Sequence, residues 1–266
     1  MADSWHSGRI ASSGIAIGAA FPLPVAEMSV ARQAAEVSTP AAEEGALRAA
    51  IAAAVADIGD LMATASGDAS DILEFQIAML EDDALSEPAF AEIAAGTTAE
   101  AAWQAALTAQ IADYAASDDD YFRARMADLA DMQDRVLRHL RGEAAIIVPP
   151  GAVLLGDDLT PSLFLSQDWS QGGAIALSKG SSSSHVAMLA RMRQVPMVVG
   201  LNIDLQRIAP GTLIIVDAED GRIAIAPDTG LRQVTEQRRQ RLATELALAE
   251  TYRLRPGRTA DGEPAG

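Results

Sequence analysis

The spacing of the apolar residues changes twice along the chain, and this change constrains the fold more than any other feature. Between residues 41 and 141 the apolar side chains recur at intervals of three and four, the repeat of one face of an α-helix. The first such stripe holds Leu47, Ile51, Val55, Ile58 and Met62. Residues 9–25 and 144–228 instead hold short apolar runs separated by glycine and proline, the pattern of strands and turns. The sequence therefore predicts a helical block flanked by α/β segments.

The helical block divides into consecutive amphipathic stretches. They span residues 41–65, 71–80, 98–116 and 119–141. The second is expected to end in the acidic turn Glu81-Asp82-Asp83, and Gly142 stands where a C-cap would end the last. Short polar links between neighbouring helices favour an antiparallel bundle.

The strand-like segments on either side of the block are expected to pair with each other, because residues 9–25 have no strand partners within the helical block. We expect residues 1–28 and 144–229 to form one α/β domain into which a helical domain, residues 29–143, is inserted. A charged linker helix at 230–255 and a flexible tail at 256–266 complete this assignment.

The composition limits the kinds of site and the compartment. The chain has no cysteine, which excludes disulfides and thiolate metal sites. It has no uncharged apolar stretch of about 18 residues, and its start, MADSWHSGR, lacks the apolar core of a signal peptide. The default expectation is a soluble, cytoplasmic protein without membrane insertion.

The negative charge is concentrated in the helical block. Residues 29–143 carry 22 acids and 7 arginines, giving −15 of the net −17, and the remaining residues give −2. Such a segment would repel nucleic acid and would attract a basic protein partner. A solvated, acid-rich surface of an alanine-rich protein would give the same charge. Composition alone does not distinguish this interpretation from a binding surface for a basic partner.

Of the three histidines, His185 has the neighbours that group-transfer chemistry needs. It opens a short helical pattern directly after a small polar loop. That loop consists of Gly180, Ser181, Ser182, Ser183 and Ser184. Ser183 or Ser184 can cap the helix, and the free N–H groups and the dipole at its start form an anion site. His6 and His139 are better explained as structural residues.

A neutral imidazole nitrogen at this position could attack phosphorus in line, and the helix dipole disfavours the imidazolium form. Arg191 and Arg193 follow within two turns and could offset charge on the phosphoryl oxygens. A capped helix after a serine-rich loop, without any chemistry, also fits this local pattern. Other sites fit less well, since no G-x-S-x-G elbow, Walker A loop, G-x-G-x-x-G or H-E-x-x-H motif occurs. Scattered histidines with no nearby carboxylate pair disfavour a metal site.

The residues around His185 resemble a known motif. Ser184–Gly200 is similar to the phosphohistidine motif of the phosphoenolpyruvate-utilising enzymes, roughly GGxTSHxxIxAR followed by IPxVVG. Three further stretches resemble enzyme I of the phosphoenolpyruvate-dependent phosphotransferase system. They are the opening Ile10–Gly18, the helical Ile72–Leu85 with its M-L-E-D ending, and the D-L-T-P-S loop Asp158–Ser162.

This resemblance implies a swivelling α/β domain that carries the phosphorylated histidine and an inserted helical bundle that binds the small phosphocarrier HPr. The phosphoryl group would pass from phosphoenolpyruvate to Nε2 of His185 and then to HPr. Thr160 would hydrogen-bond the imidazole, Ser184 would fill the serine of the motif, and Arg191 would be the arginine of its A-R pair. The HPr contact would involve the acidic residues Glu74, Glu81, Asp82 and Asp83.

The chain also departs from the family pattern. Ser181-Ser182-Ser183 stand where the motif has G-R-T, so the loop loses an arginine, and Ser13 replaces an expected proline. The family continues into a phosphoenolpyruvate-binding barrel that holds Mg²⁺, and Arg258–Gly262 resembles the threshold of that barrel. We therefore expect no metal or cofactor in this chain, with the phosphoenolpyruvate-binding domain as a partner, and exchange with HPr rather than direct use of phosphoenolpyruvate. Two alternatives stay open: a truncated enzyme I-like segment of the dihydroxyacetone kinase phosphotransfer system, and a non-catalytic HPr-binding module.

Overall fold

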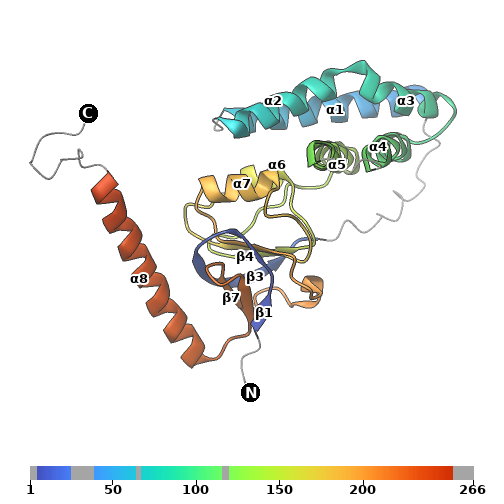
Figure 1. The fold of residues 1–266 in the computed structure, drawn as a ribbon. Coiled ribbons are helices and arrows are strands. Elements are labelled where there is room, and N and C mark those ends of the chain that lie inside the picture. Colours follow the sequence, from blue (N-terminus) through green and yellow to red (C-terminus); the bar gives the residue numbers. More distant parts are fainter. Residues whose placement is uncertain (1–4, 25–38, 64–66, 116–119, 254–266) are drawn as a thin grey trace, which may run out of the picture.

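The computed structural model describes residues 5–24, 39–63, 67–115 and 120–253. A layer of helices lies on one side of a β-sheet, with two short helices between them, as Figure 1 shows. A long helix, α8 (Thr229–Arg253), points away from both. The mixed α/β class with a helical bundle is confirmed. The expected tail at 256–266 and the boundary near residue 28 lie outside the described residues.

The helical layer follows the predicted helical block. It contains α1 (Pro40–Met62), α2 (Asp68–Glu81), α3 (Asp83–Ala94), α4 (Ala99–Ala115) and α5 (Asp120–Arg141). Gly142 adopts φ 65°, so it ends α5 in the left-handed conformation expected of a C-cap. Helix α3 was not expected, because no amphipathic stretch is predicted between the acidic turn and residue 98. The side chain of Asp82 accepts a hydrogen bond from the N–H of Ala84 at 2.9 Å, which starts a new helix at this turn.

The sheet combines the beginning of the chain with its second half. Its strands are β1 (Trp5–Ser7), β2 (Arg9–Ser12), β3 (Ile15–Pro22), β4 (Val153–Gly156), β5 (Ala174–Leu177), β6 (Met197–Val199), β7 (Leu213–Asp217) and β8 (Arg222–Ile225). The order is β1-β8-β7-β3-β4-β5-β6-β2, with β3, β4, β5 and β6 mutually parallel. Strand β3 pairs with β7 and β4, which confirms that the first strands complete the later sheet.

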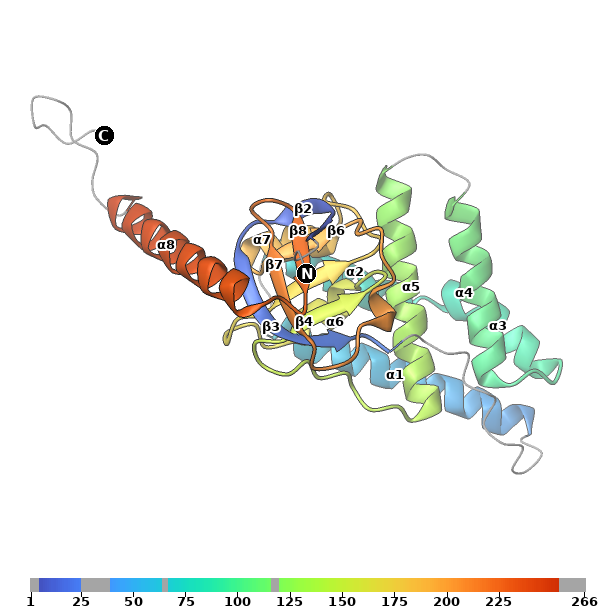
Figure 2. The same ribbon diagram turned by 90° about the horizontal axis from the view of Figure 1, so that it is seen from below.

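Only Gly8 separates β1 from β2, yet these strands lie at opposite ends of the order. The sheet must therefore curl until its two edges approach each other. The labels of β2 and β8 lie close together in Figure 2. The apolar run 145–148 does not form a strand. Instead Gln167 occupies its backbone groups, with Oε1 accepting from Val148 N at 2.8 Å and Nε2 donating to Ile146 O at 3.0 Å.

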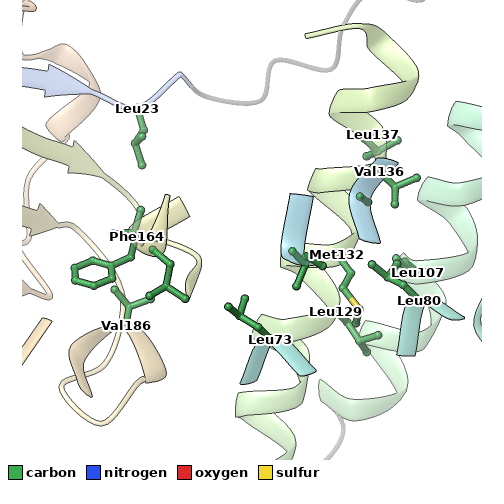
Figure 3. Close-up of a cluster of buried hydrophobic side chains, with 14 of the residues drawn as sticks. Leu23, Leu73, Leu80, Leu107, Leu129, Met132, Val136, Leu137, Phe164 and Val186 are labelled. Atoms are coloured by element: carbon green, nitrogen blue, oxygen red, sulfur yellow. The ribbon is translucent and has the colours of Figure 1, made fainter. Parts of the chain in front are cut away.

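Two helices lie between the sheet and the helical layer: α6 (Pro161–Leu165) and α7 (His185–Met192). A short 3-10 turn, η1 (Leu205–Arg207), precedes β7. One continuous apolar cluster joins the two parts of the molecule. In Figure 3, Leu73 of α2 lies between Phe164 and Val186 on one side and Leu129 and Met132 on the other. The packing of the helical layer on α6 and α7 therefore determines what surrounds the first residue of α7.

Candidate functional site

His185 is the first residue of α7, as the sequence predicts. Ser184 is the N-cap, with φ −67° and ψ 159°, and its Oγ accepts from Ala187 N at 3.2 Å. The capping residue is thus Ser184 rather than Ser183. The helix packs into the core through Val186 and Leu189, while 31% of the His185 side chain stays exposed. The imidazole therefore lies at the positive end of a capped helix, within reach of solvent.

The two ring nitrogens of His185 have different surroundings. Nδ1 is buried, and no described residue forms a hydrogen bond with it. It lies 3.8 Å from Oδ1 of Asp128, whose side chain is only 3% exposed. Nε2 is then the nitrogen that an incoming group can approach. Asp128 belongs to α5 and was not among the site residues predicted from the sequence.

The serine loop uses many of its own hydrogen-bonding groups. Gly180 adopts φ 83°, a conformation that favours glycine, and its carbonyl accepts from Nη2 of Arg9 at 3.1 Å. The hydroxyls of Ser181 and Ser183 are 2.9 Å apart. Ser183 N donates to Ser181 Oγ and Ser184 N donates to Ser181 O, each at 3.2 Å. The predicted anion site is therefore smaller than the full loop, because these two N–H groups are occupied.

Arg191 connects the serine loop to the sheet. Its Nη1 donates to Ala11 O at 2.7 Å and to Ser182 O at 3.0 Å, so one guanidinium nitrogen joins β2 to the loop. A guanidinium has further N–H groups that can face a phosphoryl oxygen. Arg193 is the C-cap of α7, and its guanidinium carbon lies 5.7 Å from the centre of the Phe164 ring.

Thr160 caps α6, with Oγ1 accepting from Leu163 N at 3.3 Å. Between the described residues Thr160 and His185 the structure has no hydrogen bond. The hydroxyl still has a proton to donate, so the predicted contact with the imidazole stays a prediction. Ser162 lies two residues after Thr160, and both its backbone N–H and its hydroxyl donate hydrogen bonds to Asp131 of α5.

The four predicted partner-binding acids are all exposed and lie near the junction of α2 and α3. Glu74 and Glu81 are two helical turns apart on α2 and so share a face. Asp82 caps α3 and Asp83 lies in its first turn. A groove of about 360 Å³ opens beside them, lined by residues that include Glu81, Asp83 and Phe90.

An exposed ion pair lies beside the start of the loop. Lys179 Nζ lies 2.8 Å from Asp157 Oδ2, and Ser178 Oγ lies 2.5 Å from Oδ1. These hydrogen bonds hold the pKa of Asp157 below its ordinary value. Within the described ranges, no group of three or more histidine or carboxylate side chains is arranged to hold a metal ion. None of the described helices is long and apolar enough to cross a membrane.

Comparison with known proteins gives consistent matches over both parts of the chain. The family described as phosphoenolpyruvate-utilising enzyme, N-terminal, matches residues 7–125, and that described as phosphoenolpyruvate-utilising enzyme, mobile domain, matches residues 148–221. The phosphoenolpyruvate-protein phosphotransferase of Geobacillus stearothermophilus is 30% identical over 250 residues, covering 90% of this chain and 43% of that protein. The protein of the same name from Streptomyces coelicolor is 32% identical over 257 residues, covering 94% and 45%.

A solved structure is also similar. A solution NMR structure of an Enzyme I protein superimposes with a TM-score of 0.70 at 25% identity, covering 90% of this chain and 99% of that one. The chain thus spans less than half the length of the curated relatives it matches, but nearly all of this solved structure.

Proposed function

The chain belongs to the phosphoenolpyruvate-utilising enzymes, of which it has the N-terminal and mobile domains, and from this we propose that it transfers phosphoryl groups through His185. The group would be held on Nε2 and exchanged with the phosphocarrier HPr, as in enzyme I of the phosphotransferase system. The observation that carries this proposal is a partly exposed imidazole at the N-terminus of α7, with its other nitrogen buried beside a carboxylate.

The proposed step needs no proton transfer at the attacking atom. The lone pair of Nε2 forms a bond to phosphorus while the nitrogen–phosphorus bond of the donor phosphohistidine breaks, and that electron pair returns to the donor ring. The phosphoryl oxygens would face the N-terminus of α7 and the guanidinium of Arg191, which offset their negative charge. Ser184 would hold the helix start in place beneath the reacting ring.

The proposed partner surface is the acidic corner formed by Glu74, Glu81, Asp82 and Asp83. All four side chains are exposed, and the helical block to which they belong carries most of the negative charge. A basic face of HPr would be attracted to such a surface. Phosphoenolpyruvate would enter through a separate phosphoenolpyruvate-binding domain, and we place the exchange in the cytoplasm.

Mass spectrometry after incubation with two donors tests the proposal. Phosphorylated HPr should place an acid-labile phosphate on His185, and unphosphorylated HPr should remove it. Phosphoenolpyruvate alone should not label the 266-residue chain, and His185→Ala should stay unlabelled with either donor. Absence of phosphate on His185 after incubation with phosphorylated HPr would refute phosphoryl transfer. If HPr still bound under those conditions, the non-catalytic binding module would be the better description.

A further inference from the structure

Helix α5 buries charged side chains on the face that it turns inward. Asp128, Asp131 and Arg135 follow one another at intervals of three and four, so they share this face, and each is at most 5% exposed. Burying an ion is costly unless it is paired or hydrogen-bonded, and apolar residues often stabilise such positions better. Each of these charges therefore needs an explanation from what it contacts.

The contacts of Asp131 and Arg135 lie within the helical layer and at the start of α6. Asp131 accepts hydrogen bonds from Gln76 Nε2 at 3.1 Å and from both donors of Ser162. Arg135 Nη1 lies 3.4 Å from Asp57 Oδ2 on α1. Asp128 in addition approaches the proposed site, because its carboxylate lies 3.8 Å from a buried nitrogen of the proposed nucleophile.

We propose that Asp128 is a positioning residue for His185, an inference that rests on the proposed function. A neutral imidazole carries its proton on either nitrogen, and the nitrogen without it holds the lone pair. A carboxylate accepts hydrogen bonds and cannot donate one, so Asp128 favours the proton on Nδ1. The separation exceeds a hydrogen bond by less than about 1 Å, which a small ring rotation removes. Nε2 then keeps the lone pair that attacks phosphorus.

The same contact assists the transfer itself. As the bond from Nε2 to phosphorus forms and the donor bond breaks, the ring gains positive charge while the proton stays on Nδ1. The carboxylate of Asp128 offsets this charge from the buried side. Because Asp128 lies on α5 and His185 on α7, the contact exists only while the helical layer packs on α6 and α7. The arrangement of the two parts therefore selects the reactive nitrogen.

NMR of the His185 ring nitrogens tests this directly, without any phosphoryl donor. Long-range proton–nitrogen spectra should show the proton on Nδ1 in the unmodified chain. In Asp128→Asn the proton should move wholly or partly to Nε2, because the amide can donate to Nδ1. Asp134→Asn is the matched control, since it neutralises an exposed carboxylate of the same helix, and it should leave the proton on Nδ1.

Three results would overturn the inference: a proton on Nε2 in the unmodified chain, an unchanged spectrum in Asp128→Asn, or an equal change in both variants. The first of these results is measured on the unmodified chain, so it does not depend on whether a variant folds. Phosphoryl uptake from phosphorylated HPr should slow about 10- to 100-fold in Asp128→Asn. Asp128→Glu, which keeps a carboxylate, should recover part of that loss and the proton on Nδ1. If the unmodified chain took up no phosphate, the proposed function would fail, while the ring spectra would still decide the role of Asp128.

Discussion

At the scale of single residues, Asp131 joins the helical layer to the α/β part through Ser162, and it joins α5 to α2 through Gln76. Its carboxylate accepts from the backbone and hydroxyl of Ser162 at the start of α6, and from the amide of Gln76 on α2. Because Asp131 is buried, removing it would leave these donors without an acceptor in a site that excludes water. A residue in this position stabilises the contact on which the geometry around His185 depends.

We predict that Asp131→Ala lowers the free energy of unfolding by about 2–3 kcal/mol, the cost of losing charge-assisted hydrogen bonds and leaving buried donors unpaired. Urea unfolding followed by circular dichroism would measure it. Asp71→Ala is the control, because Asp71 is exposed on α2 and should change the stability by less than about 0.5 kcal/mol. Equal effects of the two substitutions would contradict the role assigned to Asp131.

Two residues of the site differ in how far the sequence alone could predict them. His185 could be selected because its loop, its cap and its motif are contiguous in the chain. Asp128 could not, because aspartates spaced three apart on a helix are also the pattern of a solvated face. Only the packing of α5 against α7 distinguishes the two cases, and that contact joins segments far apart in the sequence.

At the scale of elements, the start of α7 has both a structural and a chemical task. Ser184 satisfies the N–H of Ala187, and it precedes the proposed phosphorylated residue. Aspartate caps helices as well as serine does, but its charge would lie next to an incoming phosphoryl group. Substitution at this position can therefore separate helix stability from phosphoryl transfer.

We predict that Ser184→Ala destabilises the protein by about 1 kcal/mol, whereas Ser184→Asp retains nearly full stability. Phosphoryl uptake should nevertheless be slower in Ser184→Asp than in Ser184→Ala, because like charges repel. Thermal unfolding and the rate of labelling by phosphorylated HPr would be measured for both. If labelling followed stability across the pair, Ser184 would act only as a cap.

Helix α8 is held at its base by a small ionic network. Arg238 Nη1 lies 2.7 Å from Oδ2 of the buried Asp217 and 3.0 Å from Oδ2 of Asp220. Arg222 contacts the same two carboxylates, and its guanidinium lies 4.2 Å from the centre of the Trp5 ring. The β7–β8 turn therefore anchors the helix through Arg238 in its third turn.

The hydrogen bond from Arg238 lowers the pKa of Asp220 below its ordinary value. A carboxyl group whose pKa is lower in the folded state stabilises that state above the unfolded pKa of about 3.9, and this contribution is lost as the pH falls through the folded pKa. We predict that NMR titration of the Asp220 carboxyl carbon gives a midpoint below about 3.9. The midpoint should rise in Arg238→Met and stay unchanged in Arg232→Met, where the arginine does not reach Asp220. An unshifted midpoint in Arg238→Met would contradict this account.

The elements themselves were mostly predictable, and the exceptions have local causes. The helical and strand periods located α1, α2, α4, α5 and the strands of the sheet except β1, which lies before the predicted strand segment. Helix α3 was missed because Asp82 can end one helix and start the next within a single residue, and Pro88 lies inside α3. The apolar run 145–148 lacks a strand partner because Gln167 takes its hydrogen bonds. A side chain that replaces a neighbouring strand as the hydrogen-bond partner leaves no periodic pattern in the sequence.

At the scale of the whole molecule, the charge is divided between two parts that pack together. The sequence predicted an acidic helical block, and four of its exposed acids, Glu74, Glu81, Asp82 and Asp83, lie near the junction of α2 and α3. The sequence could not show that these acids have different duties. Asp82 caps α3, so its substitution would change both the charge and the helix. Glu74 and Glu81 are exposed on α2 and have no such capping role among the described contacts, so they test the surface alone.

We predict that Glu74→Lys and Glu81→Lys each weaken HPr binding by about three- to tenfold, mostly through slower association, because rim charges steer encounter more than they hold the complex. The dependence of affinity on salt should weaken in both, since fewer opposite charges meet across the interface. Glu245→Lys makes the same change of net charge at an exposed position on α8 and should leave binding nearly unaltered. Calorimetry at two ionic strengths would compare the three variants. An equal loss in Glu245→Lys would mean that net charge, rather than this corner of the helical layer, attracts the partner.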